Sequence, residues 1–489
     1  MWAEPLYTAA EMRAAEETYD GPTLDLMERA GTAAAEALMS RYPEARTFSV
    51  WCGTGSNGGD GFVVARKLRE AGRSVEIRLL GEEAKVKGDA AETLARARKR
   101  GLDLTDGGAG EVVVDALFGT GFSGKPRLQA ARAIEELNAL GVPVFAIDVP
   151  SGVDASTGET AGPAIQADAT VSFHGSKVGL VVAPGRFHAG HLEIADIGLP
   201  QQDTRNRRVS ERILELVPKR GERDNKYSAG SVLVVGGSVG KTGAASLAAE
   251  AALRAGAGIC TACVPASLNL VFEQRLLEVM TRACPDEDGV MTMDAADEII
   301  EASERAGAVA LGPGLGRTGP VRALVGYLLD RLDKPIALDA DGLWAVAGHL
   351  DWIFSREAPT VLTPHEGELA RLLGRKSDWV RSRRLNAVQA GADEVGAVVL
   401  LKGADTLIAA PGRGVLVCDL GNPGLATAGA GDVLTGVVAA FLAKGMEPRL
   451  AAAAAAAAQG VAARLAAERH GGAGLLARDV VEALSPALS

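Results

Sequence analysis

The sequence is poor in cysteine, in aromatic residues and in basic charge. Its five cysteines are an odd and scattered set among 489 residues, which argues against a disulfide framework and favours a reducing cytoplasm. The net charge of −11 disfavours nucleic-acid binding, because that function needs a basic surface. The charged first twenty residues lack the apolar segment of a secretory signal, and no run has the length and hydrophobicity of a membrane span. We therefore expect a soluble cytoplasmic protein with no nucleic-acid or membrane partner.

Two local features need a separate interpretation. Cys260 and Cys263 form the one close cysteine pair, in GICTACVP, but no further Cys or His follows at metal-ligand spacing, so we predict buried, inert thiols. The alanine run at Ala451–Ala458 is rich in the best helix former but poor in residues that insert into membranes. It predicts a tightly packed helix.

What the sequence does contain is a repeated alternation of strand and helix patterns. Apolar runs such as TFSVWC, EVVVDALF and VPVFAIDVP are each followed by a helix or a Gly/Pro turn, which favours a parallel sheet covered on both faces. A polar, arginine-rich stretch lies between residues 200 and 224, and the alternation restarts at SVLVVGG. A chain of this length exceeds one ordinary core, so we predict two unrelated α/β domains, residues 1–212 and 213–489.

The segment VLVVGGSVGKTGAA (232–245) resembles a phosphate-binding loop at first sight. A Walker A loop places its first glycine five positions before the glycine of Gly-Lys-Thr. Counting back from Gly240 reaches Val235 instead, and no Walker-B-like aspartate stands out. We therefore predict a strand-to-helix turn near a ligand rather than a triphosphate cradle.

A better nucleotide-site candidate is GNPGLATAGAGDVLTG (421–436). Gly429, Ala430 and Gly431 at the start of a long apolar helix would aim free N–H groups and the positive end of the helix dipole at an anion. Asp432 would lie beside a phosphate held there. Taken alone, GAGD also fits an aspartate that is an ordinary first-turn helix residue.

Three polar loops follow three strands of the N-terminal half. They are CGTGSNGGDGF (52–62), FGTGFSGKPR (118–127) and DVPSGVDASTGE (148–159). The carboxyl ends of parallel strands lie at one edge of a sheet, where open α/β sheets bind ligands. Asp115 and Asp148 each end an apolar strand, although singly such aspartates are typical of caps and turns.

The C-terminal motifs NKYSAGSVLVVGGS, GPGLG, DADGL, LTPHEGE, LKGADT and NPGLATAGAGDVLTG together resemble the ribokinase-like family of nucleotide-dependent NAD(P)H-hydrate dehydratases. The resemblance implies that Asp432 is the catalytic base. It assigns ADP to Lys402, Gly403, Ala404, Asp405, Thr406 and Gly431, and the hydrated nicotinamide to Ala244, Gly314, His365 and Asp432. Two departures are Ala430, where the family often has Ser, and the pair Lys241 and Thr242. His365 could alternatively cap a turn.

The N-terminal loops, with LMERAG (26–31), resemble the NAD(P)H-hydrate epimerase domain, which has a Rossmann-like three-layer fold. The resemblance implies a K⁺ ion held by Asn57, Asp115 and Ser151, whose oxygens suit a hard cation. It makes Asp148 our candidate proton shuttle. The implied substrate-binding residues are Ser56, Asn57, Gly58, Gly59, Asp60, Gly119, Thr120, Gly121, Phe122, Ser123, Gly124, Lys125 and Asp148.

Together the two resemblances imply a bifunctional NAD(P)H-hydrate repair enzyme. One domain would interconvert the R and S epimers of hydrated NADH and NADPH. The other would dehydrate the S form with ADP and Mg²⁺, releasing AMP and phosphate. The resemblance also implies a homo-oligomer, a tetramer or higher. Two other readings stay open at this point: a ribokinase-like kinase acting on a vitamin precursor, and a non-catalytic scaffold.

Overall fold

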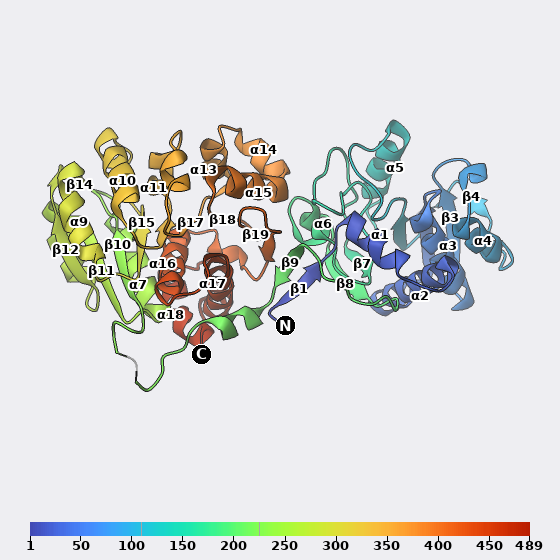
Figure 1. Cartoon of the computed structure of the whole chain (residues 1–489). Coiled ribbons are helices and arrows are strands. Elements are labelled where there is room, and N and C mark those ends of the chain that lie inside the picture. Colours follow the sequence, from blue (N-terminus) through green and yellow to red (C-terminus); the bar gives the residue numbers. More distant parts are fainter. Residues whose placement is uncertain (109, 224) are drawn as a thin grey trace. The chain divides into compact units, whose positions relative to one another are not determined.

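The computed structural model describes residues 1–108, 110–223 and 225–489. The chain divides into two compact units, and each is an α/β domain built on one large sheet (Figure 1). One unit is Pro5–Asn206, and the other combines Met1–Glu4 with Arg207–Ser489. The expected boundary after residue 212 falls within a short 3₁₀ helix, Glu211–Leu216.

The unit Pro5–Asn206 contains a seven-stranded sheet in the order β4-β3-β2-β5-β6-β7-β8. Every neighbouring pair in it is parallel. The central strands are buried along nearly their whole length, as continuous apolar runs in a two-sided sheet should be. The strands are β2 (Thr47–Cys52), β3 (Ser74–Leu79), β4 (Leu104–Thr105), β5 (Val112–Ala116), β6 (Val144–Ile147), β7 (Ala169–Phe173) and β8 (His191–Ala195).

Glycines allow helix α3 to start directly against the strand ends of this sheet. A Cβ on Gly58 would overlap the carbonyl oxygen of Gly53, and a Cβ on Gly53 would overlap that of Leu117. Any larger residue would push the helix away from the loops after β2 and β5. The helices of this unit are α1 (Ala9–Glu17), α2 (Thr23–Arg41), α3 (Ser56–Glu70), α4 (Asp89–Arg98), α5 (Leu128–Asn138) and α6 (Val178–Val181).

The other unit contains an eleven-stranded sheet in the order β1-β9-β20-β19-β18-β17-β16-β15-β10-β11-β12. The run from β18 to β12 is parallel, whereas β19 is antiparallel to both of its neighbours. The strands are β1 (Ala3–Leu6), β9 (Asn206–Val209), β10 (Ser231–Val235), β11 (Ile259–Pro265), β12 (Met280–Cys284), β15 (Ala308–Leu311), β16 (Ile336–Leu338), β17 (Thr360–Leu362), β18 (Val398–Leu401), β19 (Thr406–Ala409) and β20 (Leu416–Cys418).

Alanine-rich helices cover one face of this sheet, and other helices cover the opposite face (Figure 1). Small side chains let the helices approach the sheet and one another closely. The first group is α7 (Thr242–Arg254), α16 (Ala430–Ala443), α17 (Pro448–His470) and α18 (Ala477–Ala487). The second includes α9 (Ala296–Ser303), α10 (Gly319–Arg331), α11 (Asp341–Val346), α13 (Glu366–Leu372) and α15 (Arg384–Val395).

The two local predictions on alanine and cysteine agree with the structure. Helix α17 is long and apolar enough to cross a membrane, but 78% of its apolar window is buried within the protein, as in a core helix. All of Ala451–Ala458 is buried. Cys260 and Cys263 are free and buried in β11, and burial raises the pKa of the Cys260 thiol to about 12. Among the residues described, no three His, Cys, Asp or Glu side chains gather as metal ligands.

Candidate active sites

The loop GGSVGKT does not form a phosphate cradle. Two of its backbone N–H groups already donate to carbonyl oxygens of the protein. Gly237 N–H donates to Pro313 O at 2.8 Å, and Val239 N–H donates to Gly289 O at 3.0 Å. Lys241 Nζ lies 2.9 Å from Asp341 Oδ2. A Walker loop needs those N–H groups and that lysine for the nucleotide, so the geometry agrees with the spacing argument.

The glycine-rich segment before α16 has the form that an anion site requires. Gly429 is left-handed (φ +90°) and precedes the first helical residue. A Cβ on Gly431 would lie 3.3 Å from Lys402 Nζ, so the loop and this lysine come together. Asp432 lies in the first turn of α16. Burial, followed by the charge of Asp339, raises the pKa of the Asp432 carboxyl to about 7.

Asp339 links Lys402 to helix α16. Lys402 Nζ lies 2.9 Å from Asp339 Oδ1 and 3.8 Å from Glu368 Oε2. Thr435, one turn after Gly431, donates its hydroxyl to Asp339 Oδ2 at 2.7 Å. The result is a buried carboxylate that fixes a predicted nucleotide-binding lysine against the helix carrying Asp432. The sequence signal for it was DADGL, in which no single residue had been given a role.

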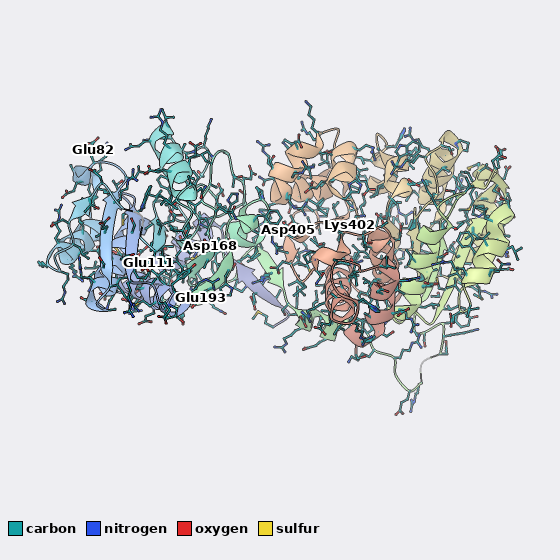
Figure 2. All side chains as sticks on the ribbon, turned by 180° about the vertical axis from the view of Figure 1, so that it is seen from behind. Glu82, Glu111, Asp168, Glu193, Lys402 and Asp405 are labelled. Atoms are coloured by element: carbon teal, nitrogen blue, oxygen red, sulfur yellow. The ribbon has the colours of Figure 1, made fainter. Side chains whose placement is uncertain are left out.

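The predicted ADP loop Lys402–Thr406 is held from inside by a buried arginine. Arg384 Nε lies 3.0 Å from Asp405 Oδ1, and Nη2 donates to the carbonyl of Asp405 at 2.8 Å. A Cβ on Gly403 would overlap Arg384 Nη2. Lys402 and Asp405 are labelled together in Figure 2. Asp405 is 1% exposed, so its side chain supports the loop from inside, and the contact of this loop with ADP stays a prediction.

The structure brings Ala244 and Gly314 together but gives His365 a second role. A Cβ on Gly314 (φ +67°) would lie 3.2 Å from Ala244 Cβ. His365 is the N-cap of α13, where its Nδ1 accepts N–H groups of Gly367 at 3.0 Å and Glu368 at 3.3 Å. This is the turn-capping alternative that the sequence left open. The imidazole is 59% exposed, and its contact with substrate stays a prediction.

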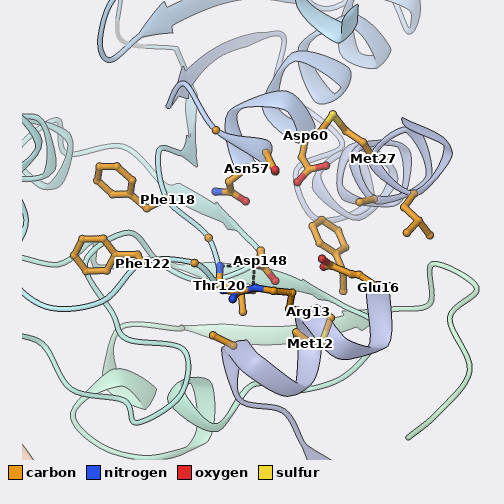
Figure 3. Close-up of a pocket in the computed structure, with 18 of the residues that line it drawn as sticks. Met12, Arg13, Glu16, Met27, Asn57, Asp60, Phe118, Thr120, Phe122 and Asp148 are labelled. Atoms are coloured by element: carbon orange, nitrogen blue, oxygen red, sulfur yellow. Dashed lines mark hydrogen bonds between the residues drawn. The ribbon is translucent and has the colours of Figure 1, made fainter. Parts of the chain in front are cut away.

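The N-terminal candidate residues surround a cavity of about 700 Å³ at the carboxyl edge of the sheet (Figure 3). Its lining includes these predicted residues: Ser56, Asn57, Asp60, Gly119, Thr120, Gly121, Phe122 and Asp148. Outside the lining are two of the predicted K⁺ ligands, Asp115 and Ser151, and five of the predicted substrate-binding residues. These five are Gly58, Gly59, Ser123, Gly124 and Lys125. Gly58 and Gly59 instead let α3 pack closely against its neighbours.

Three groups from Lys177 and Thr120 contact the carboxylate of Asp148. Lys177 Nζ lies 2.8 Å from Asp148 Oδ1, and the backbone N–H of Thr120 donates to Oδ2 at 2.8 Å, with the Thr120 hydroxyl on the same oxygen. Burial raises the pKa of Asp148, but Lys177 and Thr120 outweigh it, so the pKa lies below the usual value. Lys177, 0% exposed, was missed by sequence reasoning. Its one signal was a cation soon after the apolar strand ATVSF.

The pKa values of two other carboxyls in the cavity shift upward, opposite to that of Asp148. Burial, followed by the charges of Asp148 and Glu16, raises the pKa of Asp60 well above its ordinary range. Burial and the charge of Asp148 also raise the pKa of Glu16. Figure 3 shows Asp60 projecting from α3 and Glu16 from α1 toward the same space. The cavity therefore combines one carboxyl whose pKa is lowered with two carboxyls whose pKa values are raised.

Asn57 has the features of a cation ligand. It is 8% exposed, and its Oδ1 and Nδ2 have no hydrogen-bond partner within the described ranges. A Cβ on Gly119 would lie 3.0 Å from Asn57 Oδ1, so the amide oxygen faces the second loop. Ser151 Oγ donates to Asp115 Oδ1 at 2.6 Å and accepts Phe118 N–H at 2.9 Å. Buried amide, carboxylate and hydroxyl oxygens are a donor set that fits K⁺.

Helix α1 supplies a wall of the cavity that the sequence did not point to. Met12, Arg13 and Glu16 line it, along with Met27 of α2 and Phe118 (Figure 3). Helix α1 precedes the whole sheet, and its pattern is that of an ordinary amphipathic helix with a Thr8 capping box. No local signal distinguishes such a helix from one that only covers the core.

Comparison with known proteins identifies the family. Residues 23–179 match the family described as YjeF-related protein N-terminus, and residues 232–486 match NAD(P)H-hydrate dehydratase. A bifunctional NAD(P)H-hydrate repair enzyme of Moorella thermoacetica is 40% identical, over 98% of this chain and 96% of its own length. The corresponding enzyme of Escherichia coli K12 is 36% identical, over 94% and 88%.

A solved structure supports the fold of the C-terminal unit. A ribokinase-like superfamily protein of Enterococcus faecalis V583 has a TM-score of 0.50 and 24% identity, covering 59% of this chain and 97% of its own. The full-length relatives support repair enzymes rather than the vitamin-precursor kinase that the sequence left open. The chain belongs to the family of bifunctional NAD(P)H-hydrate repair enzymes.

Proposed function

We propose that this chain restores hydrated NADH and NADPH by epimerisation in the N-terminal cavity and ADP-driven dehydration at the start of α16. The observation that carries the proposal is the position of Asp432. It lies in the first turn of a helix, next to Lys402 and Asp339, with a pKa raised to about 7 by burial and by Asp339. A base with that pKa is well matched to proton transfer at neutral pH.

Dehydration needs a better leaving group than hydroxide. In the proposed reaction, the C6 hydroxyl oxygen attacks the β-phosphorus of ADP, the bond to AMP breaks, and Asp432 accepts the hydroxyl proton. The phosphate then leaves C6 while a proton leaves C5, which restores the 5,6 double bond. The N–H groups at Gly429–Gly431 and the ammonium of Lys402 would stabilise the transferring phosphoryl group. A Mg²⁺ ion bound with the nucleotide would neutralise phosphate charge.

Epimerisation at C6 needs no phosphoryl donor: the C6–O bond would break as the hydroxyl takes a proton and leaves as water, and water would then add to the opposite face of C6 and give up a proton. Asp148 is the proposed proton shuttle, and Lys177 and Thr120 hold its carboxylate in place. Asp60 faces the same cavity with its pKa raised by burial and neighbouring charge. One group is thus set to accept a proton and the other to donate one.

K⁺ is proposed to bind Asn57, Asp115 and Ser151. The unpartnered amide of Asn57 supports this assignment, since a buried amide without a partner is costly unless a ligand supplies one. Bound K⁺ would fix the α3 loop against the two neighbouring loops and offset negative charge from the substrate phosphates.

The test is an assay of the two partial reactions on the intact protein. A mixture of R and S hydrates with K⁺ and Mg²⁺ should equilibrate between epimers without nucleotide, but should recover reduced nicotinamide only when ADP is added. AMP and phosphate should form in equal amounts. Recovery of reduced nicotinamide without consumption of ADP or another nucleotide would overturn the phosphoryl-transfer proposal.

A further inference from the structure

We propose that Lys241 and Arg317 form a binding subsite for a phosphate group of the hydrated dinucleotide, next to the dehydration site. The inference rests on the proposed function of the C-terminal unit. We call these two residues the cation pair. They lie outside the predicted ADP loop and outside the predicted nicotinamide contacts.

The cation pair is fixed by one buried carboxylate. Asp341 is 4% exposed. Its Oδ1 accepts Arg317 Nε at 2.7 Å, and its Oδ2 accepts Lys241 Nζ at 2.9 Å and Gly316 N–H at 2.9 Å. Side chains that would otherwise be flexible are therefore held in place before a ligand arrives, which lowers the entropy cost of binding.

The charges of this cluster do not cancel. Two cations share a single carboxylate, which leaves one positive charge. The side chains of Lys241 and Arg317 are 46% and 47% exposed. Apart from Asp341, neither side chain has a hydrogen-bond or ion-pair partner among residues 1–108, 110–223 and 225–489. The terminal guanidinium nitrogens remain available, and the guanidinium fork matches phosphate oxygens.

The position of the pair fits the substrate. A Cβ on Gly314 would lie 2.7 Å from the carbonyl oxygen of Lys241 and 3.2 Å from Ala244 Cβ, so the pair adjoins the predicted nicotinamide pocket. The charge of Asp341 also reaches Asp432. Burial and the charge of Asp339 raise the pKa of that carboxyl most, Lys402 lowers it, and Asp341 raises it further. The cations are thus near the reacting end of the dinucleotide.

The pair is separated from the ADP loop along the edge of the sheet. The ADP loop follows β18, whereas Arg317 follows β15 and Lys241 follows β10. In the sheet order β18-β17-β16-β15-β10, the nearer of the two is three strands away, or roughly 14 Å at ordinary strand spacing. A phosphate of the second ligand, the hydrated dinucleotide, is the better match to this place.

Two phosphate sources share this chemistry. The pyrophosphate is present in both hydrated NADH and hydrated NADPH, whereas the 2′-phosphate is present only in the latter. The experiment compares K241M, R317M and the double variant with the wild-type full chain, with each S hydrate as substrate. Methionine keeps the apolar stem and removes the charge. Arg282→Met is the matched control, since Arg282 of β12 is 41% exposed and pairs with Glu301 of α9.

We expect the double variant to raise KM for the hydrate about tenfold or more, because a hydrogen bond to a charged group is lost at each residue. The kcat and the KM for ADP should stay near wild type. A rise for both hydrates identifies the pyrophosphate, and a rise for hydrated NADPH alone identifies the 2′-phosphate. The effect should shrink at high ionic strength.

Unchanged KM values for both hydrates would overturn the subsite, as would a rise in the KM for ADP alone. Loss of kcat together with a lower melting temperature would show that the pair only clamps loops, and would also overturn it. Wild-type protein that does not dehydrate either hydrate would instead refute the proposed function. The N-terminal epimerisation rate in each variant checks that equal amounts of active protein are compared, and the melting temperature checks that the C-terminal unit is folded.

Discussion

Each of the two candidate sites lies at the carboxyl edge of the parallel strands in its own sheet, but the two sites differ in how far their charged side chains are exposed. In the N-terminal unit the residues surround a cavity, and the ion pair of Lys177 and Asp148 is 0% and 11% exposed at its side chains. In the C-terminal unit the cations proposed to contact ligands are more accessible, from 19% for Lys402 to 47% for Arg317. The proposed epimerisation moves protons on a single ligand, which suits the enclosed N-terminal site. The proposed phosphoryl transfer joins two nucleotide-sized ligands, which suits the more open C-terminal site.

The largest predicted effect is a loss of dehydration that leaves epimerisation nearly unchanged. Asp432→Asn removes the proposed base but keeps its shape, so dehydration should fall by about 10³-fold, while epimerisation changes less than about twofold. The measurement is recovery of reduced nicotinamide from the S hydrate with ADP, beside epimer exchange in the same preparation. Dehydration at the wild-type rate would show that Asp432 is an ordinary first-turn residue.

The second prediction concerns the buried pair of the enclosed site. Lys177→Met leaves Asp148 as an unpaired buried charge, so we expect the N-terminal unit to lose about 3–5 kcal/mol of stability. Epimerisation should fall by at least about 10²-fold, and dehydration should persist. Thermal unfolding and both activity assays measure this.

A double variant provides the control for that prediction. Lys177→Met with Asp148→Asn removes both charges, so stability should return toward wild type while epimerisation stays lost. Full epimerisation in the double variant would mean that the pair is structural and that the proton shuttle is elsewhere.

Potassium should affect only one of the two activities. Replacing K⁺ by tetramethylammonium should lower epimerisation roughly 10-fold to 100-fold, and dehydration measured on pure S hydrate should not change. Asn57→Ala should raise the K⁺ concentration needed for half-maximal epimerisation. Equal loss of both activities would place the ion, or its effect, outside the N-terminal cavity.

The last prediction, which is about tenfold for one pH unit, concerns the dependence of dehydration on pH. A base must be deprotonated, and burial with the charge of Asp339 raises the Asp432 pKa to about 7. The value of kcat/KM should therefore rise up to about pH 7 and level off above it, with a decrease of about tenfold for each pH unit below. Asp432→Asn should abolish this limb in any residual activity. A profile flat from pH 5 to 8 at saturating Mg²⁺ would contradict this assignment.

The sequence predicted the strands and the loops that follow them, because apolar runs and glycine clusters are local signals. It therefore located Asn57, Asp148 and Asp432 at strand or helix ends. It did not predict which side chains pair across the fold. Lys177, which follows β7, forms an ion pair with Asp148, and Asp339 accepts a hydrogen bond from Thr435 of α16. Such pairs depend on tertiary packing between segments far apart in the chain.

His365 and Asp405 show a related limit. Both lie in recognisable motifs, LTPHEGE and LKGADT, but the structure uses the first as a helix cap and the second as the buried partner of Arg384. A motif indicates that a segment reaches the site. It does not tell whether a given side chain faces the ligand or supports the loop from behind.

The first residues of the chain have a consequence for how the protein is made. Met1–Glu4 belong to the unit whose other residues begin at Arg207, and β1 neighbours β9 in its sheet. During translation, β1 emerges before the intervening domain and stays without its neighbour β9 until that whole domain has left the ribosome. A fragment that starts after the intervening domain would lack this edge strand, so the eleven-stranded sheet forms in full only when segments from both sides of that domain are present.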